Sequence, residues 1–448
     1  MAAKNRIYYT LIIIFIVILR GYSQTYSLST IAGSGTGYSG DGGPATAANL
    51  FNPMAICTGS RGDFYISDWY NTRIRMVDAA GIISTVSGVG IFGYSGDGGL
   101  ATSAEIKGPM GICEDDSGNI YFCDIGNSRI RKINTNGVIT TIAGNGVYGF
   151  SGDNSAATAA ELSAPSGICA DRNGNIYVAD VFNNRIRMIS PAGIITTVAG
   201  NGFRGYLGDG LAATAASFYY PVAVAADRSG NLYIADADNS RIRQVNNAGM
   251  VSTVAGDGVF GSSGDGSPAT AAQLGNPSGV WVDNDGNIFI ADGLNNRIRK
   301  VDTLGIITTI AGTGVAGTTF TSGDAAQALI DNPAGITGDN AGNIYFTNVF
   351  NQLVQKLSPV LSLHPGKLSI TVYPSPGNGL FTFYVDNFSG PLELSVYDVI
   401  GRKIESAELV QSLSTINLER ESSGIYFYRI TQLNNFPVSD GKIMIIKN

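Results

Sequence analysis

The chain has 448 residues and few titratable side chains, and what it lacks excludes several kinds of site. It contains one histidine, His364, four cysteines and only 14% charged residues. A single histidine excludes metal centres built from several histidines and disfavours Ser-His or Cys-His catalysis. With 28 basic against 35 acidic residues the net charge is −7, so nucleic acid and anionic membranes are not expected partners. The sequence predicts no cofactor.

Only one long apolar run is present, and it lies at the amino terminus. Lys4 and Arg6 precede an apolar stretch over residues 7–19, and Gly21 and Ser23 follow it. At ~1.5 Å per residue the stretch would span roughly 20 Å as a helix, which is too short for a ~30 Å hydrocarbon core. This pattern is typical of a secretory signal peptide over residues 1–24. An uncleaved anchor is the alternative, because Arg20 ends the run.

Glycine is abundant instead, with 59 residues, and it punctuates an internal repeat. The tripeptide Arg-Ile-Arg recurs every 56 residues, starting at Arg73, Arg129, Arg185, Arg241 and Arg297. Each period contains four short runs rich in β-branched and aromatic residues, separated by turn residues, which predicts four strands and thus a propeller blade. A degraded sixth copy spans residues 351–356. A strand-like segment at residues 26–31 supplies the outer strand that this copy lacks. We therefore predict an all-β chain with a six-bladed propeller over residues 25–360, closed by its amino-terminal strand.

The repeat resembles a known family. The pattern Pro-x-Gly-Ile-x-x-Asp-x-x-Gly-Asn-Ile-Tyr-Val-Ala-Asp-x-x-Asn-x-Arg-Ile is similar to the NHL repeat. The loop Gly-Tyr-Ser-Gly-Asp-Gly-Gly-Pro-Ala-Thr, residues 37–46, resembles the variant found in bacterial NHL propellers and in the teneurin propeller. The resemblance implies the propeller fold but little about activity, because NHL propellers include RNA binders, adhesion modules, lyases and scaffolds.

The repeated polar residues are expected to hold the blades. Asp68 and its four counterparts close the second strand of each unit, and Asn348 replaces them in the sixth. We expect them to organise the next turn and to pair with arginine. Arg185 and Arg187 share one strand face, so their stems are expected to pack between blades while the guanidinium groups find carboxylates or carbonyls.

An aspartate also repeats in the Gly-Asp-Gly loops, before a short Ala-Thr-Ala-Ala segment. With Pro44 and Pro268 in its first turn, this segment is predicted to be a short helix whose start the aspartate stabilises. Calcium is the alternative, because carboxylates and carbonyls of Gly-rich loops can ligate it. The weak calcium candidates are Asp41, Asp97, Asp153, Asp209 and Asp265.

Three of the cysteines recur at one strand position. Cys57, Cys113 and Cys169 are expected to be too far apart for a disulfide and to be buried thiols. A strained bridge between Cys113 and Cys123, on adjacent strands of one hairpin, is the alternative.

One rim of the propeller varies from unit to unit. Chain direction places the long loops and the Asp-x-x-Asn turns on one face, and aromatic residues vary there. Exposed aromatic side chains are typical anchors for partners or sugars. The first candidates for ligand binding are Trp69, Tyr70, Phe182 and Phe350, followed by Phe92, Tyr148, Arg204 and Phe260. The alternative is that these rings pack the loops onto the blades.

The repeat ends before the carboxyl-terminal segment. After a linker at residues 361–367, short alternating strands predict a β-sandwich over residues 368–448. This segment resembles the type IX secretion sorting domain (type A) of Bacteroidota, which implies export across the outer membrane and release or surface attachment. The resemblance rests on Tyr373, Pro374, Pro376, Gly379, Tyr397, Asp398, Gly401, Gly424 and Tyr426.

The sequence therefore predicts a secreted or cell-surface propeller that binds an unknown protein or glycan and is handled by the type IX secretion machinery. No catalytic residue is assigned, and no stable membrane span is expected after signal cleavage. The alternatives are a lyase or glycan-active hydrolase that uses carboxylates on the central face, and a structural surface module. Amidating lyases resemble this fold but use histidine-bound metal, and the predicted propeller contains no histidine.

Overall fold

The computed structural model describes residues 25–318, 323–360, 370–373, 378–385, 392–409, 413–432 and 437–447. The chain divides into two compact units, Met1–Val360 and Leu361–Asn448. The predicted signal peptide and linker lie outside the described residues, so their boundaries stay predictions.

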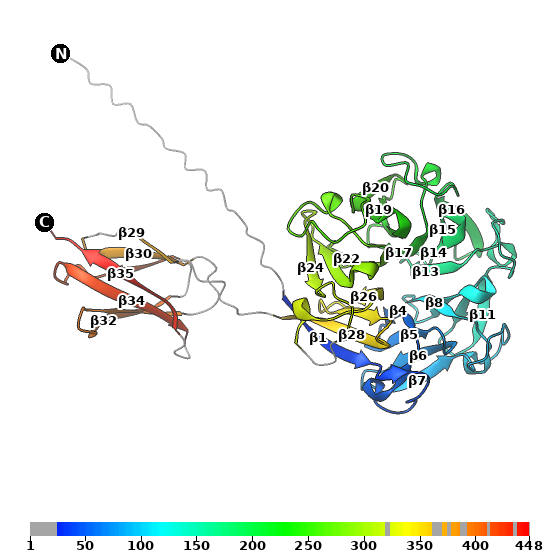
Figure 1. Ribbon diagram of the computed structural model, residues 1–448, viewed down its shortest axis with the longest axis horizontal. Coiled ribbons are helices and arrows are strands. Elements are labelled where there is room, and N and C mark those ends of the chain that lie inside the picture. Colours follow the sequence, from blue (N-terminus) through cyan, green and yellow to red (C-terminus); the bar gives the residue numbers. More distant parts are fainter. Residues whose placement is uncertain are drawn as a thin grey trace, which may run out of the picture. The chain divides into compact units, whose positions relative to one another are not determined.

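The first unit is a ring of six antiparallel sheets around an axis (Figure 1). In each complete blade the chain runs from the innermost to the outermost strand, and each strand pairs with the next. The first five blades are β4 (Pro53–Thr58), β5 (Phe64–Asp68), β6 (Arg73–Val77) and β7 (Ile83–Ser87); β8 (Pro109–Glu114), β9 (Ile120–Asp124), β10 (Arg129–Ile133) and β11 (Ile139–Ala143); β13 (Pro165–Ala170), β14 (Ile176–Asp180), β15 (Arg185–Ile189) and β16 (Ile194–Ala199); β17 (Pro221–Ala226), β18 (Leu232–Asp236), β19 (Arg241–Val245) and β20 (Val251–Ala255); and β21 (Pro277–Val282), β22 (Ile288–Asp292), β23 (Arg297–Val301) and β24 (Ile307–Ala311).

The sixth blade is completed by the amino-terminal strand. It consists of β26 (Pro333–Gly338), β27 (Ile344–Asn348), β28 (Leu353–Val360) and β1 (Thr25–Ala32), with the short β25 (Gly323–Asp324) at its edge. Strand β1 runs antiparallel to β28, with Leu28 opposite Leu357, and both side chains are fully buried. The predicted closure and the predicted number of blades are thus confirmed, and the ring has no open end.

The six innermost strands converge on the axis because small residues line it. A Cβ atom on Gly167 would lie 2.5 Å from the Cα of Ala223, and one on Gly279 would lie 2.1 Å from the carbonyl oxygen of Ala334. Farther out, apolar side chains from neighbouring blades pack together, as Ile176 and Val178 of the third blade do with Cys113 of the second.

Loop tips and turns meet on one face of the ring. The Asn71 side-chain amide donates a hydrogen bond to the carbonyl of Gly37 at 2.6 Å, and each of the other blades repeats this contact. We call this surface the loop face; it comprises the loop tips at residues 36–37, 91–93, 147–149, 203–205, 259–261 and 315–317 and the turns that follow the second strands. The short elements of the loops and turns are β2 (Gly35–Thr36), β3 (Asn49–Leu50), β12 (Ser155–Ala156), η1 (Ala45–Ala47), η2 (Ala101–Ser103), η3 (Ile125–Asn127), η4 (Ala157–Ala159), η5 (Val181–Asn183), η6 (Ala213–Ala215), η7 (Ala237–Asn239), η8 (Ala269–Ala271), η9 (Gly293–Asn295) and η10 (Ala325–Gln327).

The second unit is a two-sheet sandwich, as predicted. One sheet contains β29 (Ile370–Tyr373), β30 (Leu380–Val385) and β33 (Leu413–Asn417), and the other contains β31 (Leu392–Tyr397), β32 (Lys403–Leu409), β34 (Gly424–Gln432) and β35 (Pro437–Ile445). Phe381 and Val396 are fully buried in its core. Asp398 accepts the N–H groups of Ile400 and Arg402 in the hairpin turn, where Gly401 has a φ of 84°. Pro374 and Pro376 lie outside the described residues.

Candidate ligand-binding face

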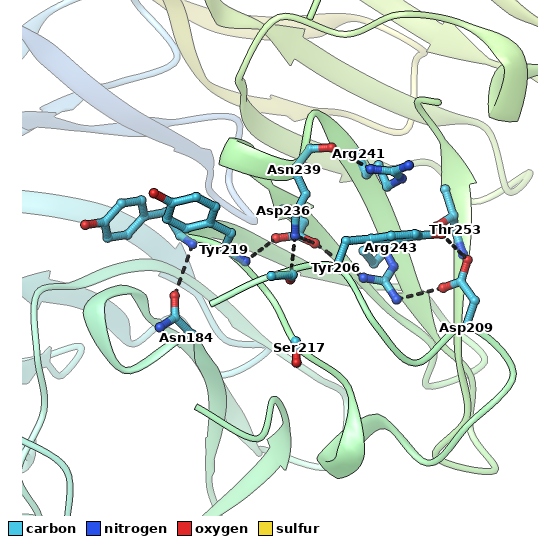
Figure 2. A network of polar contacts seen from close by, with 12 residues as sticks. Asn184, Tyr206, Asp209, Ser217, Tyr219, Asp236, Asn239, Arg241, Arg243 and Thr253 are labelled. Atoms are coloured by element: carbon cyan, nitrogen blue, oxygen red, sulfur yellow. Dashed lines mark hydrogen bonds and ion pairs between the residues drawn. The ribbon is translucent and has the colours of Figure 1, made fainter. Parts of the chain in front are cut away.

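A buried arginine links the loop to the blade below the loop face, and the fourth blade shows its geometry (Figure 2). Arg243 lies 3.3 Å from Asp236, at the end of β18, and 2.7 Å from Asp209 of the Gly-Asp-Gly loop. Asp236 also accepts the backbone N–H of Tyr219 at 2.7 Å and the amide of Asn239 at 2.8 Å. One guanidinium group therefore joins a loop, a strand end and a turn.

The same arrangement recurs in five blades, and it confirms the predicted pairing of aspartate with arginine. The other four sets are Arg75 with Asp68 and Asp41, Arg131 with Asp124 and Asp97, Arg187 with Asp180 and Asp153, and Arg299 with Asp292 and Asp265. The first arginine of each motif finds carbonyls instead: Arg185 donates to Asn183 at 2.9 Å and to Asn201 at 3.0 Å.

The aspartates of the Gly-Asp-Gly loops do not stabilise the helix starts, so that prediction is wrong for the first five loops. Asp41 pairs with Arg75 at 2.6 Å, whereas η1 begins after Pro44 with no side-chain cap. Among the loop aspartates that the structure describes, only Asp324, in the irregular sixth loop, accepts a hydrogen bond at a helix start, from Ala326 at 3.0 Å. The five calcium candidates thus act as arginine partners, and the described residues contain no group of three or more metal-ligating side chains.

The two carboxylates that flank each arginine have different environments. Burial raises the pKa of Asp68 to about 6, although hydrogen bonds from Asn71 and from the guanidinium of Arg75 favour the ionised form. Asp97 is partly exposed, and the burial it does have would raise its pKa; hydrogen bonds and the charge of Arg131 outweigh that effect and hold the pKa below its usual value. Both carboxylates of each set are thus engaged with one arginine of the frame.

The sixth blade carries a neutral version of the frame. Asn348 takes the place of the buried aspartate and donates to Gln355, which stands where the other blades have arginine, at 2.9 Å. Asn348 still accepts the backbone N–H of Asp331 at 2.9 Å. The hydrogen-bond pattern thus survives without the charges.

The four cysteines are free thiols, as expected, but Cys169 is only partly buried, contrary to the prediction. Cys57, Cys113 and Cys123 are buried, and burial raises their pKa well above the usual value. Cys113 lies opposite Tyr121 in the hairpin and forms no disulfide with Cys123. Their role is packing between blades.

The predicted rim residues lie on the loop face, and most of them are exposed. The side chains of Phe92, Tyr148, Phe260 and Phe350 are 58–60% exposed. Tyr70 is 46% and Phe182 47% exposed, Arg204 is exposed, and Trp69 is half-buried with its ring 4.2 Å from that of Tyr70.

The structure brings two of these rings together with two tyrosines that sequence reasoning missed. The ring centroids of Tyr148 and Phe182 are 6.0 Å apart, those of Phe182 and Tyr220 5.3 Å, and those of Tyr220 and Tyr219 5.1 Å. We call these four residues the aromatic row; it crosses the third and fourth blades. The available signal was the Tyr-Tyr pair directly before Pro221, where no other unit has two aromatic residues.

A second, smaller cluster lies on the first blade. Tyr70 packs between Trp69 and Phe51, with ring centroids 4.2 and 4.7 Å away. In the described part of the chain Phe92, Phe260 and Phe350 make no ring contact with either group. The rim is therefore two clusters with separate rings between them, and not one continuous belt.

Among the described residues, the stretch of the axial channel between the innermost strands offers no acid pair, whereas a pocket at the turns between the first two strands is lined by carboxylates, which are Glu114, Asp115, Asp116, Asp171 and Asp227. The channel lining consists of small and apolar residues of the innermost strands, such as Met54, Ser166 and Val224, and contains no carboxylate among the described residues. At the turns between the first two strands, Asp171 and Asp227 accept backbone N–H groups of their own turns.

The closed ring with its frame of arginine and aspartate defines an NHL-type β-propeller, and comparison with known families agrees. The model of the teneurin NHL domain matches residues 92–149, 148–205, 202–263 and 260–322, together more than half of the chain. The chain therefore belongs to the teneurin NHL domain family. The model of the secretion system C-terminal sorting domain matches residues 371–446.

Curated relatives share the propeller part. Teneurin-4 of Mus musculus is 34% identical over 232 residues, which are 46% of this chain and 8% of that protein. SUPPRESSOR OF QUENCHING 1, chloroplastic, of Arabidopsis thaliana is 30% identical over 282 residues, 59% of this chain and 26% of that protein. The chain thus spans about a quarter or less of the length of these relatives.

Solved structures share the fold. A Bacteroides thetaiotaomicron protein of unknown function has a TM-score of 0.56 at 18% identity, covering 75% of this chain and 76% of its own. An auxiliary nutrient binding protein of the same organism has a TM-score of 0.54 at 16% identity, covering 75% and 77%.

The sorting tail settles where the protein goes. It belongs to the type IX system, so the chain is exported to the cell surface or the extracellular space. No helix in the described ranges is long and apolar enough to cross a membrane.

Proposed function

We propose that this propeller is a non-catalytic binding module outside the cell, and that its loop face binds a protein or glycan partner. The observation that carries the proposal is the contrast between frame and rim: the buried frame repeats in five blades, whereas the exposed rings above it differ from blade to blade. A repeated frame is a scaffold, and a surface of exposed aromatic residues is typical of an interaction site.

Two further observations support binding over catalysis. The carboxylates of the frame are committed to arginines, and the lining of the axial channel has none among the described residues. A propeller of similar fold is an auxiliary nutrient binding protein, which supports a binding role for this architecture.

The test compares the protein with a rim variant in a screen of glycans and outer-membrane proteins. The double variant Trp69→Ala/Phe182→Ala should lose the ligand that the unmodified chain binds, with little change in melting temperature, because Phe182 is exposed and Trp69 is only half-buried. Leu304→Ala is the matched control, since Leu304 is 82% exposed in the outer turn of the fifth blade. Lower stability with unchanged binding, or a screen without any ligand, would contradict the proposal and favour a structural module.

A further inference from the structure

Tyr220 lies at a position of the repeat where the backbone has a positive φ in every unit. Its φ is 51°, in the left-handed region, where a bulky side chain is strained. The equivalent positions hold Asn52, Gly108, Asn276 and Asn332 in four other units, residue types that tolerate this region. The remaining unit has Ala164, with a φ of 52°, so two units place a less tolerant residue there, and only Tyr220 carries a large ring. Strain of this kind is retained at functional sites, so the tyrosine ring needs an explanation beyond the fold.

The strained backbone places the Tyr220 ring at the centre of the aromatic row. Phe182 lies on one side and Tyr219 on the other, with centroids 5.3 and 5.1 Å away. The Asn184 side-chain oxygen accepts a hydrogen bond from the Tyr220 N–H at 3.3 Å. A row of ring faces, exposed at Tyr148 and Phe182 and half-buried at Tyr219 and Tyr220, therefore runs along the loop face.

One cation accompanies the row. The guanidinium carbon of Arg204 lies 5.1 Å from the ring centroid of Tyr220 and 5.8 Å from that of Tyr219. Unlike Arg243 in the frame below, Arg204 is exposed and pairs with no carboxylate of the described chain. It is a positive charge held over aromatic rings and available to an anionic group.

The hydroxyl groups of the row are available as well. Within the described ranges, the hydroxyls of Tyr148, Tyr219 and Tyr220 form no hydrogen bond with the protein. Those of Tyr94 and Tyr206, in the frame, both donate to a loop aspartate, at 2.9 and 2.8 Å. The row thus combines ring faces, open hydroxyls and one unpaired guanidinium group.

From this combination we infer that the aromatic row and Arg204 form a binding site for an acidic saccharide, an inference that rests on the proposed binding function. The C–H faces of sugar rings stack on aromatic faces, and sugar hydroxyls bond to tyrosine hydroxyls. Arg204 pairs with a carboxylate or sulfate of the same chain, since the guanidinium fork matches either anion. Tyr220 is the central stacking residue.

The key variant is Tyr220→Asn, because asparagine is the residue at this position in three other blades. It removes the ring and relieves the backbone strain, so the melting temperature should stay equal or rise. The affinity for oligogalacturonate, measured by calorimetry on the full chain, should fall about tenfold or more. This is the loss expected when an aromatic side chain that the ligand covers is removed. Phe260→Ala, an exposed ring outside the row, is the matched control and should bind normally.

Matched probes separate the sugar rings from the charge. Methyl-esterified oligogalacturonate keeps the rings and loses the carboxylates, and dextran sulfate against dextran tests sulfate in the same way. The unmodified protein should prefer one acidic probe over its neutral partner by about tenfold, and Arg204→Gln should abolish that preference. If the preference is seen with the galacturonate pair the anionic group is a carboxylate, and if it is seen with the dextran pair the group is a sulfate.

Three results would overturn this site. These are no binding to either acidic probe, equal binding to the acidic and neutral members of both pairs, or binding that Tyr220→Asn leaves unchanged. If a different ligand from the screen binds normally to Tyr220→Asn but is lost in Trp69→Ala/Phe182→Ala, the loop face is still a binding face and only the acidic-saccharide site is wrong.

Discussion

The sixth blade differs from the other five at the centre of its frame. In five blades a fully buried arginine lies between a buried and a partly exposed aspartate, as Arg187 does between Asp180 and Asp153. In the sixth, two amides, Asn348 and Gln355, keep the contact without charge. Both versions form a complete blade with the same strand register, so the fold does not require the ions.

The charged and neutral versions of the frame correlate with the loop that lies beside each blade. The Gly-Asp-Gly loops of the first five blades place an aspartate beside the arginine, whereas in the sixth loop Asp324 caps η10 instead. A single carboxylate would offset only part of the desolvation penalty of a buried guanidinium group. Where the loop acid is absent, both charges of the blade are absent too, which indicates that the three groups act as a set.

The largest expected effect comes from breaking the set in one blade. Arg187→Ala leaves the fully buried Asp180 without its cation, which should lower the free energy of unfolding by about 3–5 kcal/mol. Urea unfolding followed by circular dichroism measures this difference.

The double variant Asp180→Asn/Arg187→Gln installs the amides of the sixth blade and is the control. It should cost less than half as much as Arg187→Ala, because no unpaired charge is left in the interior. Equal losses in the two variants would show that packing of the arginine stem, and not charge balance, dominates.

The reverse change in the sixth blade should have a smaller effect. Asn348→Asp puts a carboxylate beside the neutral Gln355 in a fully buried place, at an expected cost of about 2–3 kcal/mol near neutral pH. Burial raises the pKa of such a group, so the folded state binds its proton more tightly, and the loss should grow as the pH rises from about 4 to 7.

Adding Gln355→Arg to Asn348→Asp supplies the cation but not the loop acid. Partial recovery is expected, to a stability below that of the unmodified chain. Full recovery would contradict the view that two carboxylates are needed for each buried arginine.

Much of the fold could be predicted because its signals are local or periodic. The 56-residue period located the strands, and the spare strand at residues 26–31 predicted closure, since a blade lacking its outer strand needs a partner. The pairing of Asp68 with Arg75 was predictable because Asp68 ends β5 and Arg75 lies in the adjacent strand β6, seven positions further along the chain.

The missed features depend on long-range contacts or on single departures from the repeat. Asp41 reaches Arg75 across 34 residues, and the local Ala-Thr-Ala-Ala pattern favoured a helix cap instead. Tyr219 and Tyr220 precede the innermost strand, a part of the repeat that gives no periodic signal of exposure. The ring contact between Phe182 and Tyr220 depends on how the third blade packs against the fourth. The residue spacing within one unit does not determine that packing.

The smallest expected effect concerns the loop acid of a charged blade. Asp97 is partly exposed, so Asp97→Asn should cost about 1 kcal/mol or less. The pKa of Asp97 is lower in the folded chain than its usual value, so its contribution is complete above about pH 4 and is lost as the pH falls through the folded value. The difference in unfolding free energy between the two proteins should therefore be constant from pH 5 to 7 and shrink below pH 4. Asp116→Asn, an exposed aspartate outside the frame, should show no such trend. A difference for Asp97→Asn that does not change with pH would mean that Arg131 is balanced by Asp124 alone, as a two-membered pair.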